Sequence, residues 1–243
     1  MNTAMTEFEL SLDEERVIDQ LVDHYLKKQQ LIRYYLESLQ AQVFVATESP
    51  PLSDLVHSVK RRLKARGHLK DKLVRKLRES RDSGIQFDIT TENLLTRITD
   101  LGGYRILHLH THQMAGIHEN LLNLLEDANW EHYEPPFAHI WDEESREYFE
   151  KLHIRTEVNP RLYSSVHYLI RPKGKSEPIV EIQVRTLADE IWGETDHQLN
   201  YPYPHESVAC REQLRVLARV ASSCSRLVDS IMTTHDEWLS QQR

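Results

Sequence analysis

The stretch Pro178–Thr186, PIVEIQVRT, constrains the fold most, and a helical pattern follows it without a break. Its apolar residues are β-branched, which is typical of a β-strand. Glu181, Gln183 and Arg185 occupy every second position, so their side chains share one face of that strand. A strand that had only to pack would carry Thr or Val there. This face therefore either meets water or lines a site.

The rest of the chain alternates between helical and strand patterns. Apolar spacing predicts long helices over 12–41 and 206–239, with shorter ones between them. The shorter helices are expected at 68–81, 114–130 and 187–201, and further strands at 56–64, 98–111, 152–158 and 163–171. This pattern predicts an α+β fold, a mixed β-sheet flanked by helices with long N- and C-terminal helices.

We expect three regions along the chain. These are an N-terminal helical region at 1–49, a core at 50–205 and a C-terminal helix at 206–243 that packs on the core. No stretch approaches the roughly 20 apolar residues of a membrane span. Cys210 and Cys224 give neither a disulfide framework nor zinc-ligand spacing, so a cytoplasmic protein is expected.

Charge is distributed unevenly along the chain. The net charge of −8 argues against indiscriminate binding of nucleic acid. Between Lys60 and Arg81, however, eleven Lys or Arg residues stand against two acids, Asp71 and Glu79. This basic block indicates either a focused anion site or a solvated helix face.

Two carboxylates stand at or on predicted strands: Asp100 at the entrance of 98–111, and Glu181. Brought together by strand pairing, they would bind Mg²⁺, which prefers hard oxygen ligands and often shares them with substrate phosphates. With the basic block, they fit phosphoryl or pyrophosphoryl transfer. The alternatives are that Asp100 caps a turn and that Glu181 pairs with Arg185 on a solvated face.

Five blocks occur in an order that is similar to a known family. They are SVKRRLKARGHLKDKLVRK (58–76), DLGGYRI (100–106), LYSSVHYLI (162–170), EIQVRT (181–186) and ADEIWGETDHQLNYPY (188–203). Together they resemble the nucleotidyltransferase-like synthetase domain of RelA/SpoT homologues, from about residue 50 onward. The chain has no room for the hydrolase domain or regulatory tail of the long members. It therefore resembles a small single-domain alarmone synthetase or one of the toxic relatives.

The resemblance implies an ATP-dependent pyrophosphokinase that moves the β,γ-pyrophosphate of ATP to the 3′-hydroxyl of GDP or GTP. The products would be (p)ppGpp and AMP. Asp100 and Glu181 match the family's Mg²⁺ ligands, and Glu181 would also help to deprotonate the attacking hydroxyl. The matching ATP-binding residues are Arg62, Lys64, Lys72 and Arg75.

On the acceptor side, Tyr163 matches the ring on which the acceptor base stacks, and His167 follows it. Asn200 matches a residue that reads the base edge, and His197 lies one helical turn earlier. Arg105 closes the block that Asp100 opens. Gln183 and Arg185 share the face of Glu181.

The sequence departs from the family pattern in the acceptor loop. Where the family has Gly-Tyr-Arg-Ser-x-His, residues 162–167 read LYSSVH, and a Pro-Lys pair normally found before the loop is missing. His68 stands where the ATP loop often has Ser. One alternative is therefore a toxin, with an antitoxin partner, that pyrophosphorylates the 3′ end of tRNA or makes an adenosine alarmone. Another is a non-catalytic nucleotide-binding module. The terminal helices also offer apolar faces for a homo-oligomer.

Overall fold

The computed structural model describes residues 9–162, 164–175, 178–201 and 204–242. Within these residues seven strands form one mixed sheet, in the order β1-β2-β7-β6-β4-β5, with β3 paired to β6 beside this path. The strands are β1 (Ser58–Leu63), β2 (Gly102–His108), β3 (Trp130–His132), β4 (Phe137–Ile140), β5 (Arg155–Val158), β6 (Ser165–Pro172) and β7 (Val180–Thr186). The pairs β2–β7 and β4–β5 are parallel, and the others are antiparallel. The predicted mixed sheet is confirmed.

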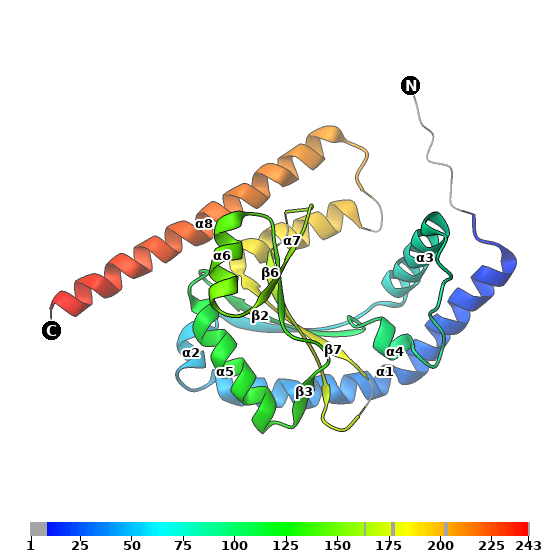
Figure 1. Ribbon diagram of the computed structural model, residues 1–243, viewed down its shortest axis with the longest axis horizontal. Helices are drawn as coiled ribbons and strands as arrows, with labels where there is room; N and C mark the ends of the chain where they lie inside the picture. The colour runs from blue at the N-terminus through cyan, green and yellow to red at the C-terminus, as the bar shows by residue number, and fades with distance from the viewer. Residues whose placement is uncertain (1–8, 163, 176–177, 202–203, 243) are drawn as a thin grey trace.

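Long helices at both ends of the chain flank this sheet, as predicted (Figure 1). The helices are α1 (Leu12–Thr47), α2 (Leu52–Leu55), α3 (Arg66–Ser83), α4 (Leu94–Arg97), α5 (Gln113–Asp127), α6 (Glu143–Lys151), α7 (Leu187–Asn200) and α8 (Val208–Gln241). The sequence interpretation missed β3, β4 and α6, because 130–151 is polar and its apolar runs are very short, and it missed the four-residue helices α2 and α4.

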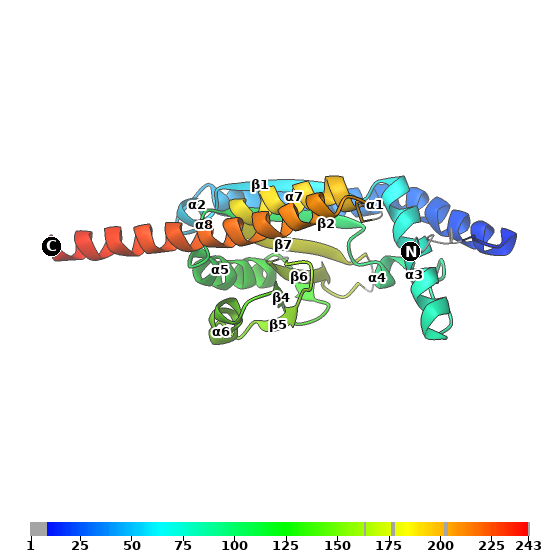
Figure 2. The ribbon, with the colours of Figure 1, turned by 90° about the horizontal axis from the view of Figure 1, so that it is seen from above.

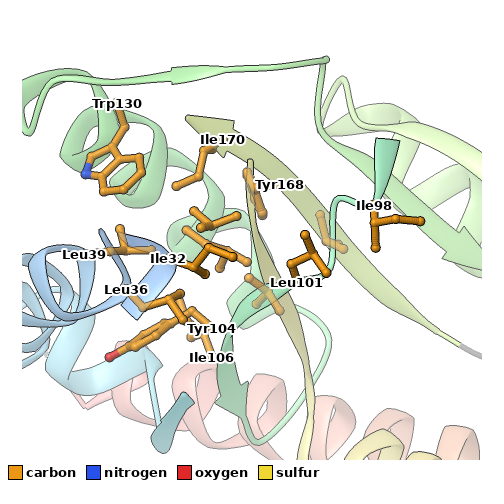
Figure 3. Packing of buried hydrophobic residues seen from close by; sticks show 14 of the residues in the cluster. Ile32, Leu36, Leu39, Ile98, Leu101, Tyr104, Ile106, Trp130, Tyr168 and Ile170 are labelled. Carbon is orange, nitrogen blue, oxygen red and sulfur yellow. The ribbon is translucent and has the colours of Figure 1, made fainter. Parts of the chain in front are cut away.

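One face of the sheet packs against α1 and α5 to form the main core. α1 starts at a capping box in which Ser11 and Glu14 exchange hydrogen bonds. Ile32 and Leu36 then lie against β2 so closely that a Cβ on Gly102 would be 2.7 Å from Ile32 Cγ2. Figure 3 shows both side chains beside Tyr104 in this cluster. Burial of such residues contributes about 1.5–3 kcal/mol each.

The two last helices form a second layer (Figures 1 and 2). α7 follows directly from β7, and Thr186 Oγ1 caps it by accepting from the N–H of Asp189 at 3.1 Å. α8 packs on α7, where Trp192 Nε1 donates to the carbonyl of Leu214 at 3.0 Å. None of the helices in the described ranges is long and apolar enough to cross a membrane.

Candidate active site

A polar row crosses the sheet on the face opposite the main core. The register pairs Lys60 of β1 with Arg105 of β2, Arg105 with Gln183 of β7, and Gln183 with His167 of β6. Cross-strand partners point to the same side of a sheet, so these side chains share one face. Glu181 lies one step along the same face, beside Gly103.

A cleft of about 330 Å³ opens over this face. Most of the residues that the sequence singled out line it. Those residues are Arg62, Asp100, Arg105, His167, Gln183, Arg185, His197 and Asn200. Four of the predicted site residues are not among the lining residues: Glu181 and Lys64, which are buried, and Lys72 and Arg75 of α3. Tyr163 lies outside the described residues.

Asp100 sits in the turn before β2 and holds two ammonium groups. Lys64 Nζ lies 2.6 Å from Asp100 Oδ2, and Lys72 Nζ lies 2.8 Å from Asp100 Oδ1. Burial raises the pKa of Asp100, but the attraction of Lys72 and Lys64 outweighs burial and holds this pKa well below its usual range. Burial also lowers the pKa of Lys64. The cluster therefore carries two cations around one ionised carboxylate.

Glu181 is buried on β7, with a partner on each carboxylate oxygen. His167 Nδ1 lies 2.7 Å from Oε1, and Gln183 Nε2 donates to Oε2 at 2.8 Å. Burial raises the pKa of Glu181, but His167 and the hydrogen bonds outweigh burial and lower it overall. The charge of Asp100 also raises this pKa.

Arg105 of the row and Arg185 of β7 both contact acids of α7. Arg105 Nη1 contacts Glu190 Oε1 at 3.0 Å and also pairs with Glu194. Arg185 pairs with Glu190 as well. A Cβ on Gly193 would lie 2.6 Å from Arg185 Nη1, so the glycine leaves room for that guanidinium. The Nζ atom of Lys60 lies 3.8 Å from Glu190 Oε1 and 3.9 Å from Glu194 Oε1.

The basic block is mostly neutralised within the fold. Of the eleven Lys and Arg residues in 60–81, eight form ion pairs with acids of α1, α3, α7 or the turn before β2. Arg62 lines the cleft, and no ion pair of the described residues involves it. Arg62 is thus a cation open to a ligand, while five of the seven cations of α3 have an acidic partner.

Three aromatic rings meet at one end of the cleft, where α3 approaches α7. The rings of His197 and Tyr201 stack at 4.7 Å, and Tyr201 Oη donates to the carbonyl of His68 at 2.8 Å. Burial and the nearby Arg62 lower the pKa of His197. Asn200 donates to Asp196 Oδ1 at 2.7 Å. The sequence placed His197 and Asn200 here but did not anticipate the contact of Tyr201 with the start of α3.

Sequence reasoning missed further lining residues, which include His139, Asn159 and Arg161. His139 lies on β4, which pairs with β6. The ring centroids of His139 and His167 are therefore only 4.8 Å apart. The only sequence signal was the position of Asn159 and Arg161 just before the acceptor loop.

The residues fit a magnesium ion that is shared with a substrate. Asp100 and Glu181 supply hard carboxylate oxygens, and each oxygen keeps a second lone pair beside its present hydrogen bond. Among the described side chains, no group of three or more His, Cys, Asp or Glu could hold a metal by itself. A Mg²⁺ ion here would therefore complete its shell with water and substrate phosphate oxygens.

The fold is a mixed sheet flanked by helices with a polar cleft on one face, and a family model identifies the class of protein to which it belongs. The model described as "Region found in RelA / SpoT proteins" matches residues 61–206. Because the match spans more than half of the chain, this protein belongs to that family. In the comparison with curated proteins, nothing matches.

Solved structures with the same fold include small alarmone synthetase 1 from Bacillus subtilis. It has a TM-score of 0.57 and 18% identity over 90% of this chain and 97% of its own. The same protein bound to its product pppGpp has a TM-score of 0.58 and 19% identity, over 85% of this chain and 98% of its own. A GTP pyrophosphokinase family protein from Streptococcus pneumoniae has a TM-score of 0.55 and 17% identity, over 94% of this chain and 97% of its own. At this identity the likeness concerns the fold, which confirms the predicted α+β fold with its long terminal helices.

Proposed function

We propose that the protein transfers the β,γ-pyrophosphate of ATP to the 3′-hydroxyl of GDP or GTP, giving (p)ppGpp and AMP. The observation that carries this proposal is the cluster around Asp100, which lines the cleft with Arg62, contacts Lys64 and Lys72, and acts by its charge on the buried Glu181. Family membership supports the reaction class. A related fold was solved with its product pppGpp, which supports a guanine nucleotide as acceptor.

The donor side supplies charge for a triphosphate. Lys64 and Lys72 are compact cations held by Asp100, and Arg62 offers a planar guanidinium that matches two phosphate oxygens at once. Transfer concentrates negative charge on the bridging and equatorial oxygens. Cations fixed in advance stabilise that charge with little reorganisation.

On the acceptor side, Glu181 would take the proton of the attacking hydroxyl. Its carboxylate is ionised, and each oxygen is held by a neighbouring donor. Mg²⁺, when bound by Asp100 and Glu181, would neutralise phosphate charge and favour ionisation of the hydroxyl. Tyr163, His167, His197 and Asn200 remain the proposed acceptor contacts, although both ring nitrogens of His167 already have protein partners, Ser165 and Glu181.

A tRNA acceptor has weaker support. Recognition of tRNA phosphates would use exposed, unpaired cations, yet most of the basic block is paired with acids of the same chain. The tRNA alternative is still tested below, because residues 162–167 depart from the family pattern of the acceptor loop. A non-catalytic module is the least supported, because both carboxylates and their cations are in place.

The test is an acceptor panel. ATP labelled in its γ-phosphate is incubated with Mg²⁺ and with GDP, GTP, unlabelled ATP or tRNA. We expect label in ppGpp or pppGpp, release of AMP, and loss of transfer with EDTA. Label found in tRNA or an adenosine nucleotide alone would replace the proposal by the toxic alternative. Absence of transfer to any acceptor would leave a binding module.

A further inference from the structure

A second hollow, the strand-end cavity, lies beyond the C-terminal ends of β2 and β7. Its volume is about 240 Å³, and it is lined by the ends of both strands, the start of β6, α6 and α8. β2 and β7 are parallel neighbours, yet the helices that follow them, α5 and α7, lie on opposite sides of the sheet (Figure 2). In open sheets, the carboxyl ends of parallel strands at such a switch between faces commonly form a ligand-binding crevice. Arg185 lines both this cavity and the cleft described above, so the two share a wall.

Polar groups gather around Thr186 at the inner end of the strand-end cavity. The register pairs Thr186 with His108, so both side chains point to the same side of the sheet. Thr186 Oγ1 donates to Asp189 Oδ2 at 2.6 Å, and Ser225 Oγ donates to Thr186 Oγ1 at 3.0 Å. His108, Thr186 and Ser225 are buried, and the walls include apolar side chains such as Met114. The cavity therefore combines an apolar wall with a compact polar end.

The side-chain hydrogens of these polar groups are used within the protein. Burial raises the pKa of Asp189 to about 6, so at pH 7.5 its carboxylate is ionised and only accepts hydrogen bonds. Thr186 must then donate to Asp189, and Ser225 must donate to Thr186. Burial lowers the pKa of His108 to about 4, so its ring is neutral at this pH. Its Nδ1 lies 2.9 Å from the carbonyl of His110, which can only accept, so Nδ1 carries the hydrogen and Nε2 keeps a lone pair.

Three acceptors thus remain at the polar end of the cavity: Asp189 Oδ1, Ser225 Oγ and His108 Nε2. Their lone pairs take no hydrogen bond from the residues that the structure describes. A ligand that offers only acceptors, such as a phosphate, would meet a carboxylate and further lone pairs here. A ligand that donates hydrogen bonds would instead satisfy buried acceptors, which are costly to leave without partners.

We propose that the strand-end cavity binds a planar nitrogen base that carries adjacent N–H donors on one edge and no anionic group. Two parallel N–H groups hold a carboxylate such as that of Asp189 in the manner of an arginine fork. The apolar walls suit the faces of the ring. A volume of about 240 Å³ is below the roughly 300–1,000 Å³ of sites for drug-sized ligands, so the cavity fits a single ring or a fused base rather than a whole nucleotide.

The side chain of Met114 allows a direct test that needs neither substrate nor turnover. The chain has four methionines; Met114 is buried in the cavity wall, and Met232 lies on the exposed end of α8. Full-length protein labelled with ¹³C in its methionine methyl groups is titrated at pH 7.5 with 2,4-diaminopyrimidine, and Met114→Leu identifies the signal. When protonated, this probe has a ring N–H beside an amino N–H. We expect a saturable shift of the Met114 signal and none of the Met232 signal.

Variants and a second probe separate hydrogen bonding from simple filling of the cavity. Asp189→Asn keeps the size of the side chain but removes its charge, so the Kd of the probe should rise about tenfold or more. Ser225→Ala removes a neutral acceptor and should raise the Kd less. Pyrimidine, the same ring without N–H donors, should give no saturable shift. Asp236→Asn changes an exposed acid on the same helix as Ser225, so it is the control and should leave the Kd unchanged. The Met114 signal without probe shows whether each variant keeps the cavity.

The proposal is overturned if the Met114 signal does not respond to 2,4-diaminopyrimidine, or if it responds equally to pyrimidine. Equal Kd values for Asp189→Asn and the unaltered protein would overturn it as well. Failure of the proposed function would look different, because it would appear as a lack of pyrophosphate transfer to any acceptor. The titration contains neither ATP nor an acceptor, so its outcome stands by itself.

Discussion

At the scale of single residues, the two carboxylates are kept ionised by different neighbours. Asp100 is held by the full charges of Lys64 and Lys72, and Glu181 by the hydrogen bonds of His167 and Gln183. A bound polyphosphate would compete with Asp100 for the two lysines, because both offer anionic oxygens to the same ammonium groups. Glu181 needs no such exchange, because its partners come from its own face of the sheet.

Glu181→Gln tests the proposed base. The amide keeps the size and a hydrogen-bond acceptor but loses the charge, so transfer to GDP should fall about 10²–10⁴-fold, the usual contribution of general base catalysis. The melting temperature should change by only a few degrees. Turnover and thermal unfolding are measured side by side. Glu37→Gln, on the exposed side of α1 beside Arg61, is the control and should keep full turnover. Near-normal turnover in Glu181→Gln would remove the residue from the mechanism.

The sequence predicted part of this residue-level arrangement. Alternation in β7 placed Glu181, Gln183 and Arg185 on one face, because side-chain direction follows directly from strand geometry. It could not show that His167 contacts Glu181, since that depends on the register of β6 against β7. Nor could it show that Arg105 and Arg185 contact acids of α7, since that depends on how the helix packs on the sheet.

At the scale of elements, α7 supports the site with its acids and its one glycine. Gly193 should resist substitution although Ala is the better helix former by about 1 kcal/mol. In Gly193→Ala, the new Cβ displaces the Arg185 guanidinium from Glu190. We expect a tenfold or greater loss of kcat/KM, with stability little changed because better helix propensity offsets part of the clash.

Gly67→Ala serves as the matched control for that substitution. Gly67 lies near the start of α3, and a Cβ there would meet no atom within 4 Å. This variant should keep its kcat/KM and unfold at the same or slightly higher urea concentration. Equal activity of both variants would show that Arg185 tolerates displacement.

The start of α7 also predicts how stability depends on pH. Burial raises the pKa of Asp189 from 3.8 to about 6, although the bonds to Thr186 oppose this shift. The folded protein therefore binds more protons than the unfolded chain between pH 4 and about 6, so stability falls as pH rises through that window. The cost is on the order of 1–3 kcal/mol above pH 6.

Asp189→Asn checks this sign, because the amide stays neutral at every pH. In urea titrations, the free energy of unfolding of the variant minus that of the unaltered protein should increase between pH 5 and pH 7.5. A difference that is constant over this range would mean that Asp189 is ionised throughout.

The elements that the sequence missed share a physical cause. β3 and β4 have three and four residues, too short for a two-residue alternation to stand out from chance. α6 has nine residues and one buried side chain, Phe149, so its helical period leaves little apolar signal. The long α1 and α8 were predicted because their apolar spacing continues over many turns.

At the scale of the whole molecule, α8 passes from the body into a projecting end (Figures 1 and 2). Its buried residues end at Asp229, whose carboxylate lies 2.5 Å from His110 Nδ1 and accepts from the N–H of His112 at 2.8 Å. From Ser230 onward, every described residue is exposed. The helix is therefore held by contacts up to Asp229, and the remaining turns add little to the stability of one chain.

Removal of residues 234–243 should leave a protein that unfolds within about 2 °C of the full chain and keeps its turnover, because no core contact is lost.

Asp229→Ala in the full chain should instead lower the free energy of unfolding by about 1–3 kcal/mol, since buried hydrogen bonds to His110 and His112 lose their acceptor. Calorimetry measures the first effect and urea titration the second. Light scattering of the shortened protein adds a separate readout. Apolar residues such as Ile231 and Trp238 are more than half exposed on this helix, so a drop in mass together with lower stability would show that α8 joins copies of the chain.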